Sequence, residues 1–167
     1  MKRLMESALV CVLVLGGAMG ASAGNPPPAF EKLKALAGDW EGKLLPDGPT
    51  ARVNYRVTSA GSVVVETIMP GEPGEMMTLF HPDGESVVAT HYCAAQNQPR
   101  MRASGLSADG KEISFKFLDV TNLASPEASH MREVTFQFQD ADHFTTTWTY
   151  RENGKDSPTT FAYIRKK

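Results

Sequence analysis

The sequence predicts an all-β domain, a roughly ten-stranded antiparallel up-and-down barrel with a short N-terminal helix. Beyond Trp40, apolar and polar residues alternate along most of the chain, which is the pattern of half-buried strands. Turn-forming pairs such as Asp83-Gly84 and Asn153-Gly154 interrupt this alternation at intervals of about ten residues. A flat meander of so many hairpins would expose two edges, so a closed barrel is expected, with a two-sheet sandwich as the alternative.

The first 23 residues are typical of a secretory signal peptide. Lys2 and Arg3 precede an apolar run over residues 8–15, and Ala21-Ser22-Ala23 matches an A-x-A cleavage site. The apolar run is shorter than the roughly 20 residues that a membrane-spanning helix needs. We therefore expect cleavage after Ala23 and a periplasmic or extracellular protein with no membrane span.

Residues 24–29 include consecutive prolines and are predicted to form a linker, so that the folded domain spans residues 30–167. The helix is predicted over residues 30–37, where Phe30, Leu33 and Leu36 recur at helical spacing and a glycine follows. A helix this short is marginal in water by itself. We expect its apolar face to dock on the barrel and close one end.

The strands are expected to follow the helix in succession. Alternation is clearest over residues 51–58, 111–118 and 143–151, and turn residues divide the remainder into segments of similar length. The predicted strands are 39–44, 51–58, 63–69, 75–81, 86–93, 100–105, 111–118, 131–138, 143–151 and 158–165.

The net charge argues against some classes of partner, and the cysteine content excludes an internal disulfide. Removing Lys2, Arg3 and Glu6 from 17 basic and 19 acidic residues leaves 15 and 18, a net charge of −3. This balance argues against nucleic acid and anionic membrane surfaces, because such partners select basic patches. Cys93 is the only cysteine after the signal peptide, so no intramolecular disulfide can form.

Two stretches carry a resemblance to known barrels. The opening LAGDWEG at 36–42 resembles the Gly-x-Trp start of lipocalin-like proteins. The segments EMMTLFHPDG at 75–84 and THYCAAQNQPRM at 90–101 are similar to a family of exported bacterial lipocalin-like proteins of unknown function. The resemblance implies a calycin-type barrel in which Arg165 covers Trp40 at the closed end. Without it, Trp40 would be an ordinary core residue and Arg165 a surface residue.

A more distant similarity is to nitrobindin, a haem-binding ten-stranded barrel that also opens with Gly-x-Trp-x-Gly. This chain lacks the Tyr-Pro that follows that opening in nitrobindins. The similarity would imply haem binding, for which His130 and His143 are candidate axial ligands.

Glu66 is the first candidate site residue, because it interrupts the apolar run 63–69 and shares a strand face with Val64 and Ile68. Apolar neighbours raise the pKa of a carboxyl group or require a cationic partner. If this face lines the barrel, Glu66 is a ligand contact or a general base. If it faces outward, Glu66 is a charge that protects the surface from aggregation.

His91 and Cys93 lie two residues apart and share a strand face. They supply only two metal ligands, and the sequence has no paired zinc-binding motif, so no metal or other cofactor is predicted. At about 7 Å, the two side chains are also too far apart for a Cys-His nucleophile pair. A core histidine and an inert thiol are favoured, and His91 is also a candidate ligand contact.

Asn97, Gln98 and Arg100 form a candidate polar end of the barrel. Amides beside a guanidinium can hold a carboxylate, with arginine as the bidentate donor. Alternatively, the amides bond only to their own loop. If Arg100 shares the lumen with Glu66 and His91, these groups must pair with each other or with a ligand. Methionines and aromatic residues, Trp148 among them, would line the apolar remainder.

These features favour a non-catalytic protein that binds one small, mainly apolar or amphipathic molecule inside the barrel. One alternative is a hydrolase or isomerase that uses Glu66 and His91 as acid and base. The others are a haem or gas binder and an interaction module that acts through its loops.

Overall fold

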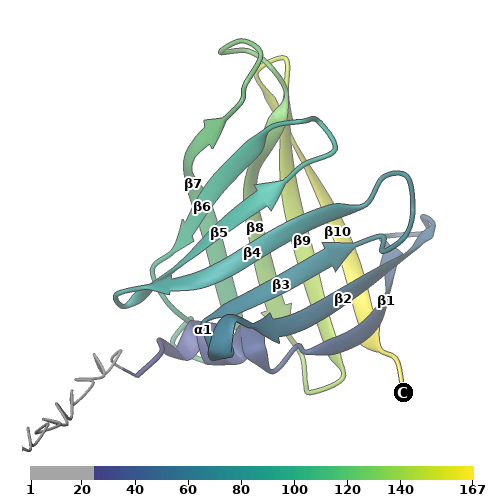
Figure 1. Cartoon of the computed structure of the whole chain (residues 1–167). Coiled ribbons are helices and arrows are strands. Elements are labelled where there is room, and N and C mark those ends of the chain that lie inside the picture. The colour runs from purple at the N-terminus through teal and green to yellow at the C-terminus, as the bar shows by residue number, and fades with distance from the viewer. Residues whose placement is uncertain (1–24) are drawn as a thin grey trace, which may run out of the picture.

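The computed structural model describes residues 25–167, so the predicted signal peptide lies outside the described residues. One short helix precedes ten strands (Figure 1). The elements are α1 (Pro28–Lys34), β1 (Gly38–Leu44), β2 (Thr50–Thr58), the 3-10 turn η1 (Ser59–Gly61), β3 (Val63–Ile68), β4 (Met76–Asp83), β5 (Ser86–Tyr92), β6 (Gln98–Ala103), β7 (Glu112–Thr121), β8 (His130–Phe138), β9 (His143–Glu152) and β10 (Lys155–Arg165).

The ten strands close into one antiparallel barrel, which confirms the predicted fold class and excludes the sandwich. Each strand pairs with its neighbours in sequence, and β1 also pairs with β10, where Trp40 lies opposite Arg165. Every predicted strand is present, with ends that differ by at most three residues. For example, β10 starts at Lys155 and not at Pro158, because the Asn153-Gly154 turn lets Lys155 pair directly with Glu152.

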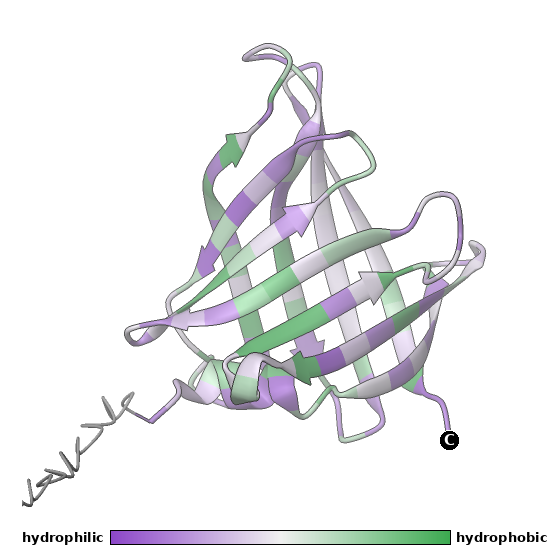
Figure 2. Cartoon of the chain, viewed as in Figure 1, coloured by the Kyte–Doolittle hydropathy of each residue, from purple (hydrophilic) through white to green (hydrophobic). Residues whose placement is uncertain are grey.

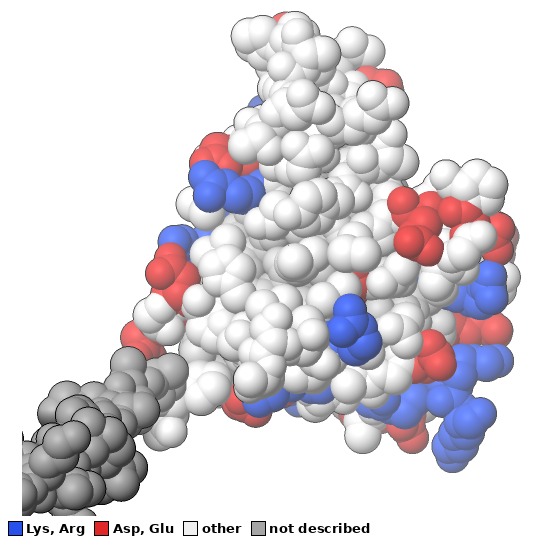
Figure 3. Space-filling view, in the orientation of Figure 1, with Lys and Arg blue, Asp and Glu red and all other residues white. Residues whose placement is uncertain are grey.

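Side chains alternate between the core and the solvent along most strands. Figure 2 shows the corresponding change of hydropathy along several strands, as green and purple segments of the ribbon. On the face in Figure 3, the charged side chains lie mainly toward the margins, in groups of mixed sign. The barrel wall therefore has a mainly apolar inner face, and its charged side chains lie outside with the exception of Glu66.

The helix α1 closes one end of the barrel, as predicted. It starts at Pro28, two residues earlier than predicted, because a proline in the first helical turn gives up no hydrogen bond, and it ends at Lys34, three residues before the predicted end. Phe30 and Leu33 are fully buried, and the helix contacts β2, β4 and β5. Within residues 25–167, no helix has the length and hydropathy to cross a bilayer.

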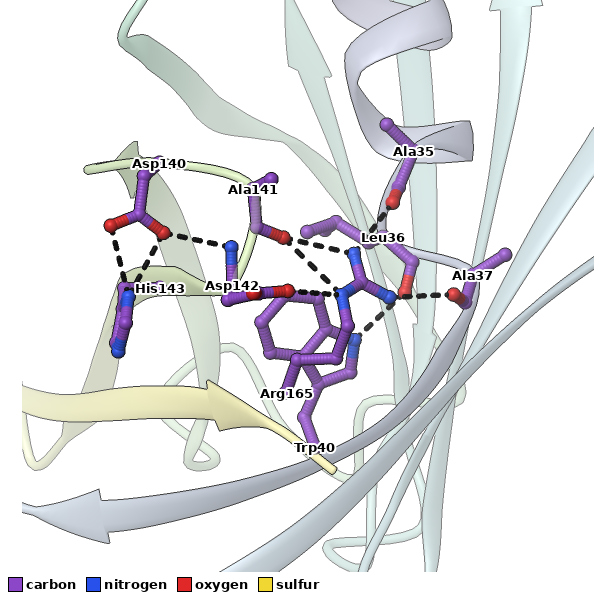
Figure 4. Close-up of polar contacts among 9 residues, drawn as sticks. All are labelled: Ala35, Leu36, Ala37, Trp40, Asp140, Ala141, Asp142, His143 and Arg165. Atoms are coloured by element: carbon purple, nitrogen blue, oxygen red, sulfur yellow. Dashed lines mark hydrogen bonds and ion pairs between the residues drawn. The ribbon is translucent and has the colours of Figure 1, made fainter. Parts of the chain in front are cut away.

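Arg165 stabilises this closed end by contacts with several elements (Figure 4). Its guanidinium carbon lies 4.1 Å from the centre of the Trp40 ring. Its two terminal nitrogens each donate to a backbone carbonyl in the α1–β1 connection, residues 35–37, at 2.9 Å. It also forms an ion pair with Asp142 in the β8–β9 turn, at 3.2 Å. The last strand, the helix and a neighbouring turn are thereby joined at one point.

The half of the barrel next to α1 is filled by aromatic rings. Phe144 meets the Trp40 ring edge-on at 4.7 Å between centroids, and Phe80 lies 5.8 Å from Phe136 in the same way. All four side chains are at most 1% exposed. This packing fills the closed half and confines any internal site to the other half.

Candidate functional site

An apolar cavity of about 220 Å³ lies toward the end of the barrel opposite α1. Its walls come from β2 to β5 on one side and from β8 to β10 on the other, so it belongs to the barrel interior. The lining residues are Ala51, Ile68, Met69, Met76, His91, Met131, Trp148, Tyr150, Thr159, Phe161 and Tyr163.

A row of four polar side chains crosses the inner wall at the level of the cavity floor. Tyr55, Glu66, Thr78 and His91 are successive cross-strand partners on β2, β3, β4 and β5. The Tyr55 hydroxyl donates to Glu66 Oε1 at 2.6 Å, and Thr78 Oγ1 lies 2.9 Å from His91 Nδ1 in a second hydrogen bond. Each of the four is at most 1% exposed. His91, at the end of the row, also lines the cavity.

Burial dominates the electrostatics of this polar row. It raises the pKa of Glu66 from 4.5 to about 7, although the Tyr55 and Thr78 hydroxyls act in the opposite direction. Burial also lowers the pKa of His91 to about 4, so its imidazole is neutral at pH 7. The pKa values of Tyr55 and Tyr163 are raised, first by burial and then by the nearby Glu66 charge.

The barrel interior offers Glu66 no countercharge. Among residues 25–167, no lysine or arginine is buried. Glu66 Oε2, His91 Nε2 and Thr146 Oγ1 are buried polar atoms without a hydrogen-bond partner in the protein. An unpaired buried polar atom costs about 1–3 kcal/mol, so such atoms are uncommon in folded proteins. The region below the cavity is therefore polar, and its net charge is either zero or negative, depending on whether Glu66 is ionised. Some of its polar atoms have no hydrogen-bond partner in the protein.

Three of the predicted site residues lie inside the barrel. Glu66 is 1% exposed and His91 is fully buried. Trp148 lines the cavity, and its ring centroid lies 4.9 Å from that of His91. Their role in ligand binding remains a prediction.

Arg100 does not share the lumen with Glu66 and His91, so the condition on which its role in the site depended is not met. Arg100 lies on the outer face of β6, where its side chain is 48% exposed and forms an ion pair with Asp119 on β7. The cause is the phase of β6, in which Met101 and Ala103 point inward and the arginine between Pro99 and Met101 points outward. The proposed carboxylate site built on Arg100 is therefore excluded from the lumen.

Asn97 and Gln98 form hydrogen bonds with neighbouring segments of the chain and do not line the cavity. The Asn97 amide donates to the Ser129 carbonyl at 2.9 Å, and Gln98 Oε1 accepts from the Thr121 hydroxyl at 3.0 Å. The first bond connects the β5–β6 loop with the β7–β8 loop, and the second joins the paired strands β6 and β7. Neither corresponds to the alternative in which the amides bond only to their own loop. Asn97 is 3% exposed and its Oδ1 has no partner in the protein.

The other candidates do not converge on the cavity. Neither His130 nor His143 lines it, and they start β8 and β9, which run antiparallel, at opposite ends of the barrel. Glu66 and His91 share no hydrogen bond, because Thr78 stands between them in the row. No three His, Cys, Asp or Glu side chains of residues 25–167 are grouped so that they could hold a metal ion.

Larger hollows lie elsewhere on the protein. One of about 430 Å³ follows the start of α1 and the β2–β3 and β4–β5 turns, and Glu85 is its only ionisable side chain. Another of about 310 Å³ is lined mainly by residues of β7, β8 and the connection between them, and includes His130 and Arg132. Of these three, the 220 Å³ cavity is the one whose lining comes from both sides of the barrel interior and lies next to the buried polar row. The 310 Å³ hollow also contains a buried polar atom without a partner in the protein, His130 Nε2.

Sequence reasoning missed Tyr55, Thr78 and Tyr163 as members of the site. Tyr55 could have been found, because pairing the predicted strands 51–58 and 63–69 across the intervening turn places it opposite Glu66. Nothing in the single sequence fixes the longer-range proximity of Tyr163 to Glu66.

No family model matches the chain, and no curated protein is significantly similar to it. The fold and the site define a closed ten-stranded β-barrel that contains an apolar cavity above a buried polar row.

Proposed function

We propose that this chain is a non-catalytic binding protein that holds one small, mainly apolar molecule in the 220 Å³ cavity. The observation that carries the proposal is the composition of the site, an apolar wall with a few polar groups at its floor. Such a combination is typical of small-molecule sites, in which apolar contacts supply affinity and polar groups fix the orientation.

The cavity volume limits the size of the occupant. A cavity of about 150 Å³ lined by apolar side chains binds benzene, whereas pockets for drug-sized ligands measure roughly 300–1,000 Å³. The occupant expected for 220 Å³ is therefore a single substituted ring or a short branched chain, not a fully enclosed fatty acid. Met69, Met76 and Met131 give this wall a deformable surface that can adapt to such shapes.

Two alanine variants test the location of the site. Ala51 lines the cavity, whereas Ala162 lies on the outer surface beside Ile164. We expect saturable binding of toluene by calorimetry, reduced at least about tenfold in Ala51→Leu because the added carbons occupy the cavity, and unchanged in Ala162→Leu. Absence of saturable binding of toluene, indole and similar single-ring probes would overturn the proposed function. Equal affinities of both variants would place the binding elsewhere.

We also propose that the protein is exported and related to lipocalin-like barrels. The signal-like residues 1–23 support export, and the packing of Arg165 over Trp40 at the closed end supports the relationship. N-terminal sequencing of the protein from the cell envelope or medium should give a chain that begins at Gly24. A soluble cytoplasmic product with an intact Met1 would contradict export.

A further inference from the structure

The polarity of the lumen identifies the kind of molecule that it can hold. The buried ionisable groups at the cavity floor are one carboxyl, Glu66, one neutral imidazole, His91, and two tyrosines. Arg100, the arginine that the sequence analysis considered for the lumen, lies on the outer face of β6. Residues 25–167 contain no buried lysine or arginine. Any positive charge that neutralises Glu66 must therefore come from the occupant.

The position of Glu66 relative to the cavity allows such a contact. Ile68, two residues further along β3 and on the same face, lines the cavity, so Glu66 lies one layer below it. Tyr163 and His91 form part of the cavity lining, and Glu66 is close enough to Tyr163 to raise its pKa. Glu66 Oε2 is buried and has no partner in the protein. Glu66 does not itself line the cavity, so a group that pairs with this carboxyl oxygen has to pass between the His91 and Tyr163 side chains of the lining.

Aromatic rings add to the preference for a cation. Trp148, Tyr150, Phe161 and Tyr163 line the cavity. The faces of such rings attract ammonium groups, most strongly where water is excluded. A carboxylate ligand would instead place a second negative charge next to Glu66, and a neutral ligand would leave Glu66 without a countercharge.

We propose that the natural occupant is a small hydrophobic amine, whose ammonium group pairs with Glu66 at the cavity floor while its apolar part fills the 220 Å³ cavity. This inference rests on the proposed function and differs from the ligand considered from the sequence, an amphipathic molecule whose carboxylate or carbonyl head would be held by Arg100. The site contains the acceptor and the aromatic wall, and the ligand supplies the donor and the charge.

Three probes of nearly equal size test the inference: benzylamine, benzyl alcohol and benzoate. We expect benzylamine to bind at pH 8 at least about tenfold more tightly than benzyl alcohol, and benzoate to bind most weakly. Glu66→Gln should abolish the preference for benzylamine over benzyl alcohol. The matched control is Glu133→Gln, which removes the same charge from an exposed residue paired with Lys116 and should retain the preference.

The wild-type protein offers a second readout that needs no variant. Glu66 faces Tyr55 on β2, Thr78 on β4 and Tyr163 on β10, with His91 next in the row. The pKa values of both tyrosines are raised and that of His91 is about 4, so Glu66 is the group among these that titrates between pH 6 and 8. Benzylamine affinity should therefore fall about tenfold from pH 8 to pH 6, while benzyl alcohol affinity stays constant.

The outcomes separate the two proposals. If none of the three probes binds, the proposed function fails. If benzyl alcohol binds as tightly as benzylamine at pH 8, or if Glu66→Gln keeps the preference, the cavity is a binding site and the amine inference is wrong. A benzylamine affinity that does not change between pH 6 and 8 would likewise overturn the pairing with Glu66.

Discussion

Replacing Glu66 with glutamine should change how the stability of the barrel depends on pH. In the folded protein the pKa of Glu66 is about 7, against 4.5 in an unfolded chain. Between these values the unfolded chain loses a proton that the folded protein keeps, so the free energy of unfolding falls as pH rises. At about 1.4 kcal/mol per pH unit, the fall amounts to about 3 kcal/mol and is complete above pH 8.

His91 has the opposite effect over a similar range. Its pKa is about 4 in the folded protein and 6.5 when unperturbed, so the unfolded chain binds a proton that the folded protein excludes. Stability therefore rises by about 3 kcal/mol between pH 4 and pH 6.5. In the wild-type protein the two contributions largely cancel from pH 4.5 to 6.5. In Glu66→Gln only the His91 contribution remains, and stability should rise steeply with pH.

The measurement is urea unfolding of both proteins at pH 4.5, 6 and 8, followed by tryptophan fluorescence and far-ultraviolet circular dichroism. Surface groups contribute equally to both proteins and cancel in the difference. We expect the stability of Glu66→Gln relative to wild type to increase by about 3 kcal/mol from pH 4.5 to pH 8. A difference that is the same at all three pH values would refute the reasoning, because it would mean that Glu66 ionises as it does in water.

Three further predictions concern the frame around the site. Leu33→Ala should lower the free energy of unfolding by about 2–5 kcal/mol, because Leu33 is fully buried at the closed end; an unchanged urea midpoint would show that α1 does not contribute. Arg100→Ala should leave toluene and benzylamine affinities within about twofold of wild type, because Arg100 pairs with Asp119 outside the barrel; calorimetry decides, and a larger loss would return Arg100 to the site. Gly42→Ala should cost about 1–3 kcal/mol in thermal or urea unfolding, since a Cβ at Gly42 would overlap the Tyr163 ring, and wild-type stability would contradict this packing.

The barrel was predictable because its two main determinants are local. Alternation of apolar and polar residues marks each strand, and pairs such as Asn153-Gly154 mark the reversals, so both can be counted along one sequence. The short helix was predictable from Phe30, Leu33 and Leu36 for the same reason. Only the ends of the elements shifted, because the pairing of a partner strand decides where a strand stops.

The position of a site residue was predictable only where its polarity differs from that of the other residues in its strand. Glu66 stands out in an apolar run, and its interior position follows from the phase of Val64, which is also buried. Arg100 follows a loop and a proline, so the residues before it do not show which strand face it occupies. Only Met101 and Ala103, which come after it and point inward, indicate that Arg100 points outward. The register between strands, which brings Tyr163 near Glu66, depends on the closure of the whole barrel and is not encoded in any short segment.

The joining of β1 to β10 also has a kinetic consequence. The bonds from Arg165 to residues 35–37 connect positions up to 130 residues apart, and contacts of such long separation form slowly because a long loop must close first. Thr159, Phe161 and Tyr163 of β10 form part of the cavity wall, so the cavity is completed only when this last strand is in place. A partly folded chain that lacks β10 would have an unpaired edge on β1 and on β9, and no enclosed site. Ligand affinity should therefore appear during refolding together with barrel closure and not with the earlier hairpins.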